Sequence, residues 1–149
     1  GTRKDFVNGI IERLLRGEKP GVVENQTASP ACTLDLADAI GAVLEKKLLP
    51  ARAAKRRFNR VFHFANRGQA TRHAMAVRIA RRLGLPHDLP RLSAQDIPGW
   101  IAVRPQYTVL DTDRIVAECG VRPRPWEEAL DAHVAGQTKG TEKGSGTAV

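Results

Sequence analysis

Apolar residues recur every three or four positions in the early part of the chain, which is the spacing of one face of an α-helix. The residues of this stripe are Phe6, Val7, Ile10, Ile11, Leu14 and Leu15. Asp5 stands before the stripe, where a carboxylate can accept a hydrogen bond from a free amide of the first turn. Gly17 follows the stripe, where a left-handed residue commonly ends a helix. The pattern therefore predicts a helix between Asp5 and Gly17.

A second helical stripe follows a short extended piece, residues 21–24, and a polar turn, residues 25–30. The apolar residues of this stripe are Leu36, Ile40, Val43, Leu44 and Leu48. Thr33 is placed to cap the helix. Pro50 is predicted to end it, because proline lacks the amide that continues the helical hydrogen bonds.

The middle of the chain combines one apolar run with a third helical stripe. Residues 61–64, Val-Phe-His-Phe, are short, rich in strand-forming residues and followed by Asn-Arg-Gly, which predicts a buried strand. His63 is then expected to be a core histidine. A third helix is predicted from about Thr71 to Leu83, with Gly84 ending it.

The C-terminal part is less regular. Residues 90–109 contain several prolines and no helical period, which predicts a loop with at most short strands. Asp111 or Thr112 is placed to cap a short fourth helix through Cys119, which Gly120 ends.

A last helix is predicted from Trp126 to about Val134. The residues after it are mostly Gly, Thr, Lys and Ser, a composition typical of unfolded termini. We therefore expect one folded domain over residues 1–135 and a disordered tail over residues 136–149.

Helices outnumber strands in this prediction, and a few short strands cannot form a doubly wound sheet by themselves. The 149 residues suffice for one domain. Because the chain opens at Gly1 and its only methionine is Met75, we expect a fragment. The predicted fold class is α/β: a mostly helical C-terminal portion with a few short strands, whose principal sheet is missing.

The basic residues are concentrated in one stretch. The chain carries 24 Lys and Arg against 16 Asp and Glu, a net charge of +8. Ten of the basic residues and no acidic residue lie within residues 51–82. Such a stretch attracts phosphates or forms a solvated face, so the alternative function is a non-catalytic nucleic-acid-binding or regulatory interaction module. Aromatic residues make up only 5% and no nucleic-acid-binding motif occurs, so we do not expect nucleic acid as a partner.

Motifs for catalysis and cofactor binding are missing from the sequence. It contains no GxGxxG, GxxxxGK[ST] or GxSxG motif, and Tyr107 has Asp111 rather than lysine four residues later. No apolar run could span a bilayer, so a membrane protein is not expected. The cysteines Cys32 and Cys119 lie in no metal-binding motif, and so few cysteines suit a reducing compartment. We expect a cytoplasmic chain without a metal site or turnover of its own.

Several short sequence motifs, in the same order along the chain, resemble the motifs of one family. Residues 22–30, V-V-E-N-Q-T-A-S-P, and the D-L-A that follows resemble the V-V-D-D-Q-x-G-S-P-T…D-L-A segment of dTDP-4-dehydrorhamnose reductases. Residues 61–65 are similar to the G-x-Y-H-x-A-G strand of that family, and residues 104–112 to its R-P-x-N-S-x-L-D-T. Residues 120–130 are similar to its G-x-x-x-P-x-W-x-E-A-L. The resemblance covers about residues 3–134.

This resemblance implies the C-terminal substrate-binding part of an extended short-chain dehydrogenase/reductase whose Rossmann sheet is missing. In that family an N-terminal Rossmann half binds NADPH and carries a Tyr-x-x-x-Lys pair, and the C-terminal half closes over the dTDP-sugar. The parent protein would reduce dTDP-4-dehydro-L-rhamnose to dTDP-L-rhamnose with NADPH. The implied partners of this chain are therefore a nucleotide sugar and the missing Rossmann half. Some members of the family dimerise through Mg²⁺, which also implies a homodimer.

Five residues are candidates for substrate binding in the light of this resemblance. Arg104 can hold a diphosphate with two parallel hydrogen bonds, or it can brace its proline-rich loop. Gln26 and Ser29 either line a sugar pocket or form a plain turn. Thr71 and Arg72 open a predicted helix, whose first turn favours an anion, although helix capping alone explains Thr71. The resembling family commonly has tryptophan at the position of Arg72, which leaves the sugar specificity open.

Overall fold

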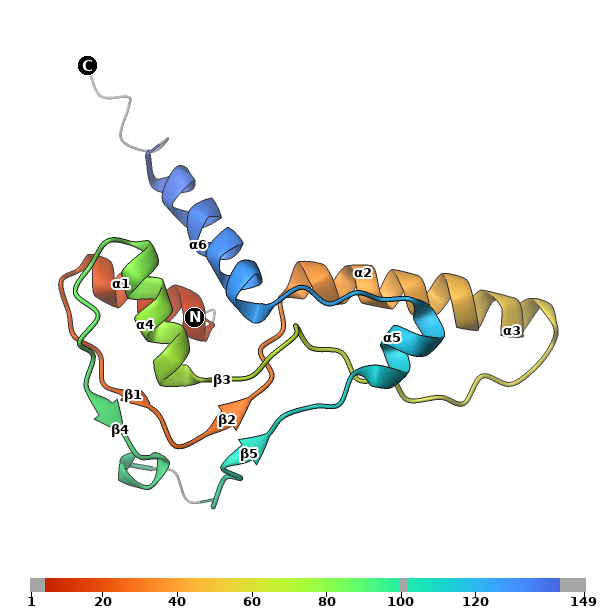
Figure 1. Ribbon diagram of the computed structural model, residues 1–149, viewed down its shortest axis with the longest axis horizontal. Helices are drawn as coiled ribbons and strands as arrows, with labels where there is room; N and C mark the ends of the chain where they lie inside the picture. Colours follow the sequence, from red (N-terminus) through yellow and green to blue (C-terminus); the bar gives the residue numbers. More distant parts are fainter. Residues whose placement is uncertain (1–4, 100–101, 143–149) are drawn as a thin grey trace.

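The computed structural model describes residues 5–99 and 102–142 as a set of helices joined by long extended segments. Figure 1 shows α1, α4 and α6 gathered at one end of the molecule and α2, α3 and α5 at the other. The bounds of the helices are α1 (Phe6–Leu15), α2 (Thr33–Val43), α3 (Leu49–Ala53), α4 (Arg72–Arg82), α5 (Asp113–Cys119) and α6 (Trp126–Glu142). In the described ranges, no helix combines the length and apolar character needed to cross a bilayer.

Helix α1 follows the sequence prediction closely. The Asp5 carboxylate accepts a hydrogen bond from the Asn8 amide at 2.9 Å, which caps the first turn. Gly17 adopts the predicted left-handed conformation at φ 77° and ends the helix. Ile10, Ile11 and Leu14 are the buried part of the stripe. Local capping and one apolar face therefore fix this element.

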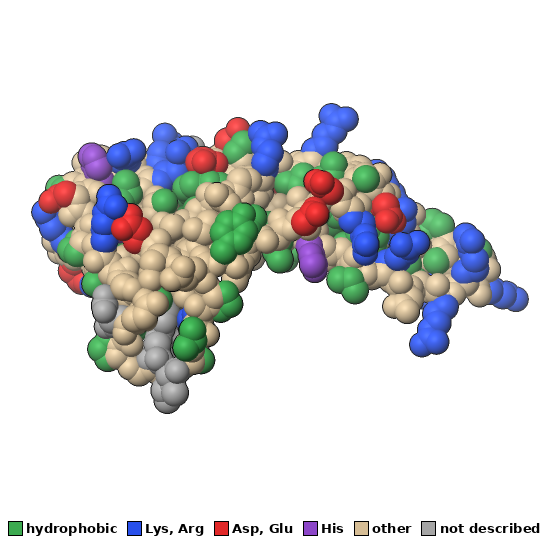
Figure 2. Space-filling model, turned by 60° about the horizontal axis from the view of Figure 1, so that its bottom comes forward, with side chains coloured by type: hydrophobic (Ala, Val, Ile, Leu, Met, Phe, Trp, Pro, Cys, Tyr) green, Lys and Arg blue, Asp and Glu red, His purple; other side chains and the backbone are tan. Residues whose placement is uncertain are grey.

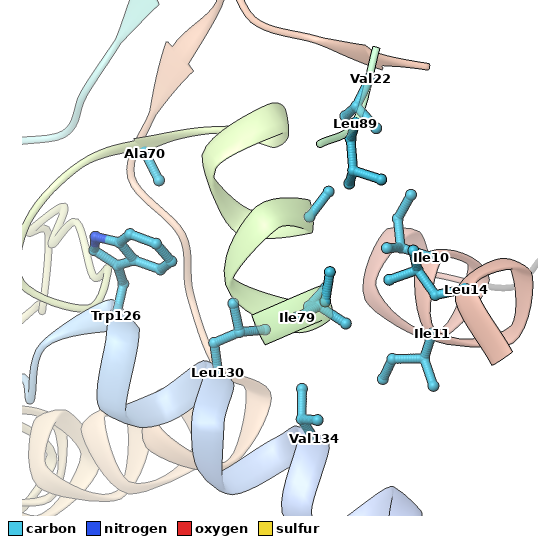
Figure 3. Close-up of a cluster of buried hydrophobic side chains, with 12 residues drawn as sticks. Ile10, Ile11, Leu14, Val22, Ala70, Ile79, Leu89, Trp126, Leu130 and Val134 are labelled. Atoms are coloured by element: carbon cyan, nitrogen blue, oxygen red, sulfur yellow. The ribbon is translucent and has the colours of Figure 1, made fainter. Parts of the chain in front are cut away.

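The main hydrophobic core lies between α1, α4 and α6 (Figure 3). Ile79 of α4 is fully buried in its centre, with Leu14 of α1 and Leu130 of α6 in the same cluster. Trp126 begins α6 and packs into this core with 8% of its surface exposed. Helix α4 begins after Thr71 and ends at Arg82, as its stripe predicted.

Two small sheets connect the helices. Strand β1 (Val22–Val23) pairs in parallel with β4 (Arg91–Leu92). Strand β2 (Thr27–Ala28) lies between β3 (Ala70–Thr71), which is antiparallel to it, and β5 (Tyr107–Thr108), which is parallel to it. The expectation of a turn over residues 25–30 is wrong for β2. Main-chain pairing, such as the 2.7 Å bond from the Thr27 amide to the Gln106 carbonyl, forms the strand without an apolar pattern.

The second helix differs from its prediction at both ends. Cys32, rather than Thr33, is the N-cap residue, and its side chain forms no capping bond. Pro50 does not end the helical rod: a π-helical turn, η1 (Leu44–Leu48), follows α2 and leads into α3. Pro50 lies in the first turn of α3, directly after the π-helical turn.

The predicted buried strand at residues 61–64 is wrong. The segment is extended, but it pairs with no strand among the described residues. Val61 is 67% exposed, and His63 is exposed rather than a core histidine. A strand needs a neighbouring main chain with free hydrogen-bonding groups, and the described part of the chain offers none there.

The C-terminal elements are mostly as predicted. Helix α5 ends at Gly120, which is left-handed at φ 65°. Helix α6 continues to Glu142 and so extends beyond the predicted end near Val134. Residues 136–142 of the expected disordered tail are therefore helical, and residues 143–149 lie outside the described ranges.

A network around Asn66 joins the two ends of the molecule. Asn66 is 3% exposed, and its side-chain amide donates to the Asp35 carboxylate and to the Arg124 carbonyl. The side-chain carbonyl oxygen of Asn66, Oδ1, accepts a hydrogen bond from the Cys32 main-chain amide at 2.7 Å. Arg124 closes the network through Nε, 2.8 Å from the Asp35 carboxylate. We name this set, Cys32, Asp35, Asn66 and Arg124, the junction network.

The Asp35→Asn substitution tests the junction network. Hydrogen bonding from Arg124, supported by Asn66 and opposed by partial burial, lowers the pKa of Asp35 below 3.8 in the folded protein. The stabilisation is therefore complete above the unfolded-state pKa and is lost as the pH falls through the folded-state pKa. We expect the variant to lose about 1–3 kcal/mol of unfolding free energy at pH 7 and the difference from wild type to shrink below about pH 4. Urea unfolding between pH 7 and pH 3 measures both.

Asp38→Asn is the matched control, because Asp38 is an exposed carboxylate on the same helix. This control should change the unfolding free energy by less than about 0.5 kcal/mol. Equal losses of unfolding free energy in the two variants would show that the hydrogen bonds of Asp35 do not stabilise the fold.

Gly68→Ala tests the close approach beside α6. Gly68 has φ 97°, and a Cβ atom there would lie 2.9 Å from Cδ1 of Trp126. Gly84 is also left-handed, at φ 68°, but nothing lies within 4 Å of its Cβ position. We expect both alanine variants to lose about 1–2 kcal/mol from backbone strain and Gly68→Ala to lose a further 1–3 kcal/mol or so from overpacking. Thermal unfolding that shows no difference between them would contradict the contact.

Candidate functional site

A groove of about 340 Å³ lies where α1, α4 and the three-stranded sheet meet. Three of the five candidate residues, Gln26, Arg72 and Arg104, line it. The other lining residues are Phe6, Ala28, Pro30, Ala70, Met75, Pro105 and Thr108. The structure therefore brings together side chains from four separate stretches of the sequence.

The three-stranded sheet positions the floor of this groove. Ala28 of β2 is paired with Ala70 of β3 on one side and with Thr108 of β5 on the other. All three residues line the groove. Because two of the three side chains in this row are single methyl groups, the main chain leaves room for a ligand above it.

Two arginines give the groove its charge. Arg72 and Arg104 are both exposed, and no carboxylate is among the described lining residues. The Arg72 guanidinium lies 5.3 Å from the centre of the Phe6 ring, a cation–π contact that orients it. Two positively charged side chains therefore line the groove, which favours an anionic group such as a phosphate.

Ser29 and Thr71 are not brought into the groove. The Ser29 hydroxyl accepts a hydrogen bond from the Leu110 amide at 2.9 Å, which fastens the loop after β5. The Thr71 hydroxyl accepts from the Ala74 amide at 3.0 Å and caps α4. Both hydroxyls therefore hold the framework of the groove. Ser29 has the structural role in a turn, and Thr71 the helix-capping role, that the sequence left open as alternatives to substrate binding.

A second hollow of about 320 Å³ adjoins the groove and shares Phe6, Pro30 and Met75 with it. Sequence reasoning missed this hollow, because its residues come from five separate segments. Its polar lining residues are Asp5, Cys32, Thr33, Asn66 and His133. The His133 ring is hydrogen-bonded to Asn8 at 3.0 Å, a pairing of residues 125 positions apart that no local pattern indicates. The hollow extends the groove toward the junction network.

The described residues do not fit a dinucleotide or a metal ion. The segment that leads into α4 holds a single glycine, Gly68, rather than the glycine-rich turn that cradles a pyrophosphate. Within the described ranges no three His, Cys, Asp or Glu side chains gather as a metal site. We therefore assign neither NADPH nor Mg²⁺ to residues of this chain.

The basic stretch of the sequence does not form one surface. Its first part, residues 52–60, is exposed at the far end of the α2–α3 rod, where Figure 2 shows a group of Lys and Arg side chains. Its last part lies on α4, where Arg78 forms two 2.8 Å hydrogen bonds to the Asp131 carboxylate. Arg82 also lies 3.7 Å from that carboxylate. Part of the predicted charge is therefore neutralised within the fold.

Comparison with known proteins identifies similar chains. The dTDP-4-dehydrorhamnose reductase of Mycolicibacterium smegmatis is 32% identical over 146 residues, which cover 97% of this chain and 41% of the relative. The solved structure of a dTDP-4-dehydrorhamnose reductase ortholog from Clostridium acetobutylicum is 25% identical, with a TM-score of 0.76 over 93% of this chain and 45% of that one. The reductase of Bacillus anthracis, solved in complex with NADP, shares the fold at 22% identity, with a TM-score of 0.71 over 89% of this chain and 43% of that one.

All of these matches cover a similar share of the relative, a little over two fifths of its length. The chain spans about two fifths of the length of the curated relatives it matches. Its fold is that of the C-terminal substrate-binding part of such reductases, with about half of the residues helical and few short strands. The family described as the RmlD substrate binding domain matches residues 1–138. The chain therefore belongs to the RmlD substrate binding domain family.

Proposed function

We propose that this chain forms the nucleotide-sugar-binding side of a dTDP-4-dehydrorhamnose reductase. The observation that carries the proposal is the groove in which Arg72 and Arg104 meet over a floor of small residues. These arginines lie 32 positions apart in the sequence. Only the pairing of β2 with both β3 and β5 brings their segments to one place.

The groove matches the chemistry of a dTDP-sugar in two respects. The guanidinium of Arg104 is planar and always charged, so it can donate two hydrogen bonds to a diphosphate, with Arg72 adding a second positive charge. The lining also includes apolar surface from Phe6 and Met75 and hydrogen-bonding groups from Gln26 and Thr108. Such a mixture suits a base or sugar ring that carries hydroxyl groups.

The whole protein would reduce the C4 ketone of dTDP-4-dehydro-L-rhamnose with NADPH and give dTDP-L-rhamnose. Reduction needs a hydride donor and a group that protonates the ketone oxygen. The single tyrosine of this chain, Tyr107, has no lysine four residues later and bonds instead to Gln69 at 3.1 Å. This chain therefore contributes substrate binding and orientation, and the remaining part of the protein contributes the NADPH site and the proton donor.

The proposal also includes the cellular location and the oligomeric state of the protein. Cys32 and Cys119 are both free thiols, which supports the expected cytoplasmic location. A homodimer, as the family resemblance implied, stays part of the proposal. Ser29 and Thr71 act in it only by fixing the loops around the groove.

Arg104→Ala tests the diphosphate role. We expect the variant to bind dTDP about 10–100-fold more weakly than the wild-type chain, because one charge-assisted contact is worth about 1.5–3 kcal/mol. Arg104→Lys should recover only part of the affinity, since an ammonium group cannot form the bidentate pair. Isothermal titration of the 149-residue chain with dTDP measures the three affinities.

Arg57→Ala is the matched control, because Arg57 is an exposed arginine in the basic stretch at the far end of the rod. Its dTDP affinity should equal that of the wild-type chain. An unchanged affinity in Arg104→Ala would remove the diphosphate role. Salt-sensitive, micromolar binding to duplex DNA, lost in Arg57→Ala, would instead favour the nucleic-acid alternative.

The division of labour gives a second test of the proposed function. The chain alone should not oxidise NADPH in the presence of dTDP-4-dehydro-L-rhamnose, because no tyrosine–lysine pair is present. The same chain joined to the N-terminal part of a dTDP-4-dehydrorhamnose reductase should oxidise NADPH, with loss of absorbance at the nicotinamide band. A joined protein that binds dTDP but never oxidises NADPH would contradict the reductase assignment and leave only a binding role.

A further inference from the structure

The far end of the α2–α3 rod carries five basic side chains within nine residues. No Asp or Glu occurs between Glu45 and Asp88 in the sequence. Figure 1 shows α3 at the end of the molecule away from α1 and α4, and Figure 2 shows the Lys and Arg side chains at this end. The five residues are Arg52, Lys55, Arg56, Arg57 and Arg60, all of them exposed. We name this set the basic tip.

The basic tip differs from the rest of the described chain in how its charges are paired. Elsewhere basic side chains meet carboxylates: Arg78 lies 2.8 Å from Asp131, and Lys47, on the same rod, lies 3.3 Å from Glu118. Among the described residues, no carboxylate forms an ion pair with any member of the basic tip. The charge of this end therefore does not stabilise the described fold, and it favours an anionic partner outside the chain.

The main chain at the basic tip adds a second, independent observation. A Schellman motif ends α3, in which the Arg56 amide donates to the Ala51 carbonyl at 2.8 Å and the Lys55 amide to the Arg52 carbonyl at 3.0 Å. The motif needs a left-handed residue, and Lys55 fills this position at φ 52°. Glycine adopts this conformation without strain, whereas a residue with a Cβ atom does not. The turn therefore carries a positive charge at a position where the main chain favours glycine.

Exposed leucines lie beside the basic tip. Leu49 is 55% exposed at the start of α3 and precedes Arg52 by three residues, a spacing that places two side chains on the same side of a helix. Leu48, directly before α3, is 36% exposed. Leucine enters the boundary between headgroups and acyl chains of a bilayer, while long basic side chains reach the lipid phosphates. This combination of groups suits the surface of an anionic membrane.

We propose that the basic tip is a peripheral membrane-binding surface that takes the phosphate headgroups of anionic lipids. The attachment is reversible, because it uses a few charges and exposed leucines, and the described chain has no helix that could cross a bilayer. The groove with Arg72 and Arg104 lies away from the tip, beside α1 and α4, so it stays open in the attached chain. The inference goes beyond nucleotide-sugar binding and does not depend on it.

Nucleic acid is the other polyanion that a basic surface attracts. Single strands are held by aromatic side chains on which the bases stack. The aromatic residue within the range of the tip, Phe58, stacks instead on Phe62, with ring centroids 6.4 Å apart and an angle of 20° between the rings. A duplex is read by a helix in its major groove, and α3 has only five residues. The exposed leucines therefore favour the bilayer over nucleic acid.

Vesicle co-sedimentation of the 149-residue chain tests the proposal. Vesicles of phosphatidylcholine with about 30% phosphatidylglycerol are compared with vesicles of phosphatidylcholine alone. We expect binding to the anionic vesicles to be at least about tenfold tighter than to the neutral ones. Raising the salt from about 50 to about 500 mM should weaken it at least about tenfold, because salt screens the attraction. Equal binding to the two kinds of vesicle would overturn the proposal.

Two double variants separate the basic tip from the net charge of the chain. Arg56→Ser with Arg57→Ser removes two charges from the tip, and Arg81→Ser with Arg122→Ser removes two charges elsewhere. All four side chains are exposed, so both double variants keep the buried core intact. The tip variant should bind anionic vesicles about 10–30-fold more weakly, and the control less than about threefold more weakly. Equal weakening in the two would show that net charge alone decides the binding and would contradict a localised surface.

Leu49→Ser distinguishes a bilayer from nucleic acid. The variant should bind anionic vesicles about 3–10-fold more weakly, because it loses apolar contact with the lipid. Its affinity for duplex DNA should not change, since a phosphate backbone gains nothing from the leucine. A vesicle affinity that the substitution leaves unchanged, or duplex DNA bound more tightly than the vesicles at about 150 mM salt, would overturn the proposal. None of these measurements includes dTDP, so their failure stays distinct from a failure of the proposed function.

Discussion

The fold depends on the hydrogen bonds that converge on Asn66. A buried asparagine side chain must satisfy both its amide hydrogens and its carbonyl oxygen, since each unpaired group costs about 1–3 kcal/mol. Here the partners come from two segments: the start of α2, through Cys32 and Asp35, and the chain before α6, through Arg124. The Asn66 main-chain amide also donates to the Pro30 carbonyl. Since Pro30 lines both the groove and the adjoining hollow, one residue sets the position of the binding surface and of the rod.

The shape of the groove depends mainly on the pairing of its strands, and only a few side chains determine its charge. Its floor follows from strand register, in which Ala28 faces Ala70 and Thr108 across two neighbouring strands. The charge that selects an anion comes from Arg72 and Arg104 at its rim. Main-chain pairing tolerates substitution, so relatives can share the framework and differ in the residues that read the sugar.

Local signals predicted helices well, and long-range pairing was the part that sequence reasoning could not supply. Helix α1 is set by Asp5 and Gly17 within its own turns, so its ends were predictable. Residues 61–64 carry the pattern of a strand but find no partner in the described chain, so pattern alone gave the wrong state. Arg104 and Gln26 could be nominated by resemblance, yet their meeting depends on β5 pairing with β2. His133 had no local signal at all.

The π-helical turn at Leu44–Leu48 changes how a row of exposed apolar side chains winds around the helix axis. The row consists of Leu36, Ile40, Leu44 and Leu48. In a regular α-helix each step of four residues overshoots a full turn by about 40°, so Leu36, Ile40, Leu44 and Leu48 would wind progressively around the axis. The wider π turn takes up an additional residue and rotates the row back. These four side chains consequently wind less around the axis than they would in a regular α-helix. The π-helical turn therefore keeps more of these apolar side chains toward one side of the rod over its length.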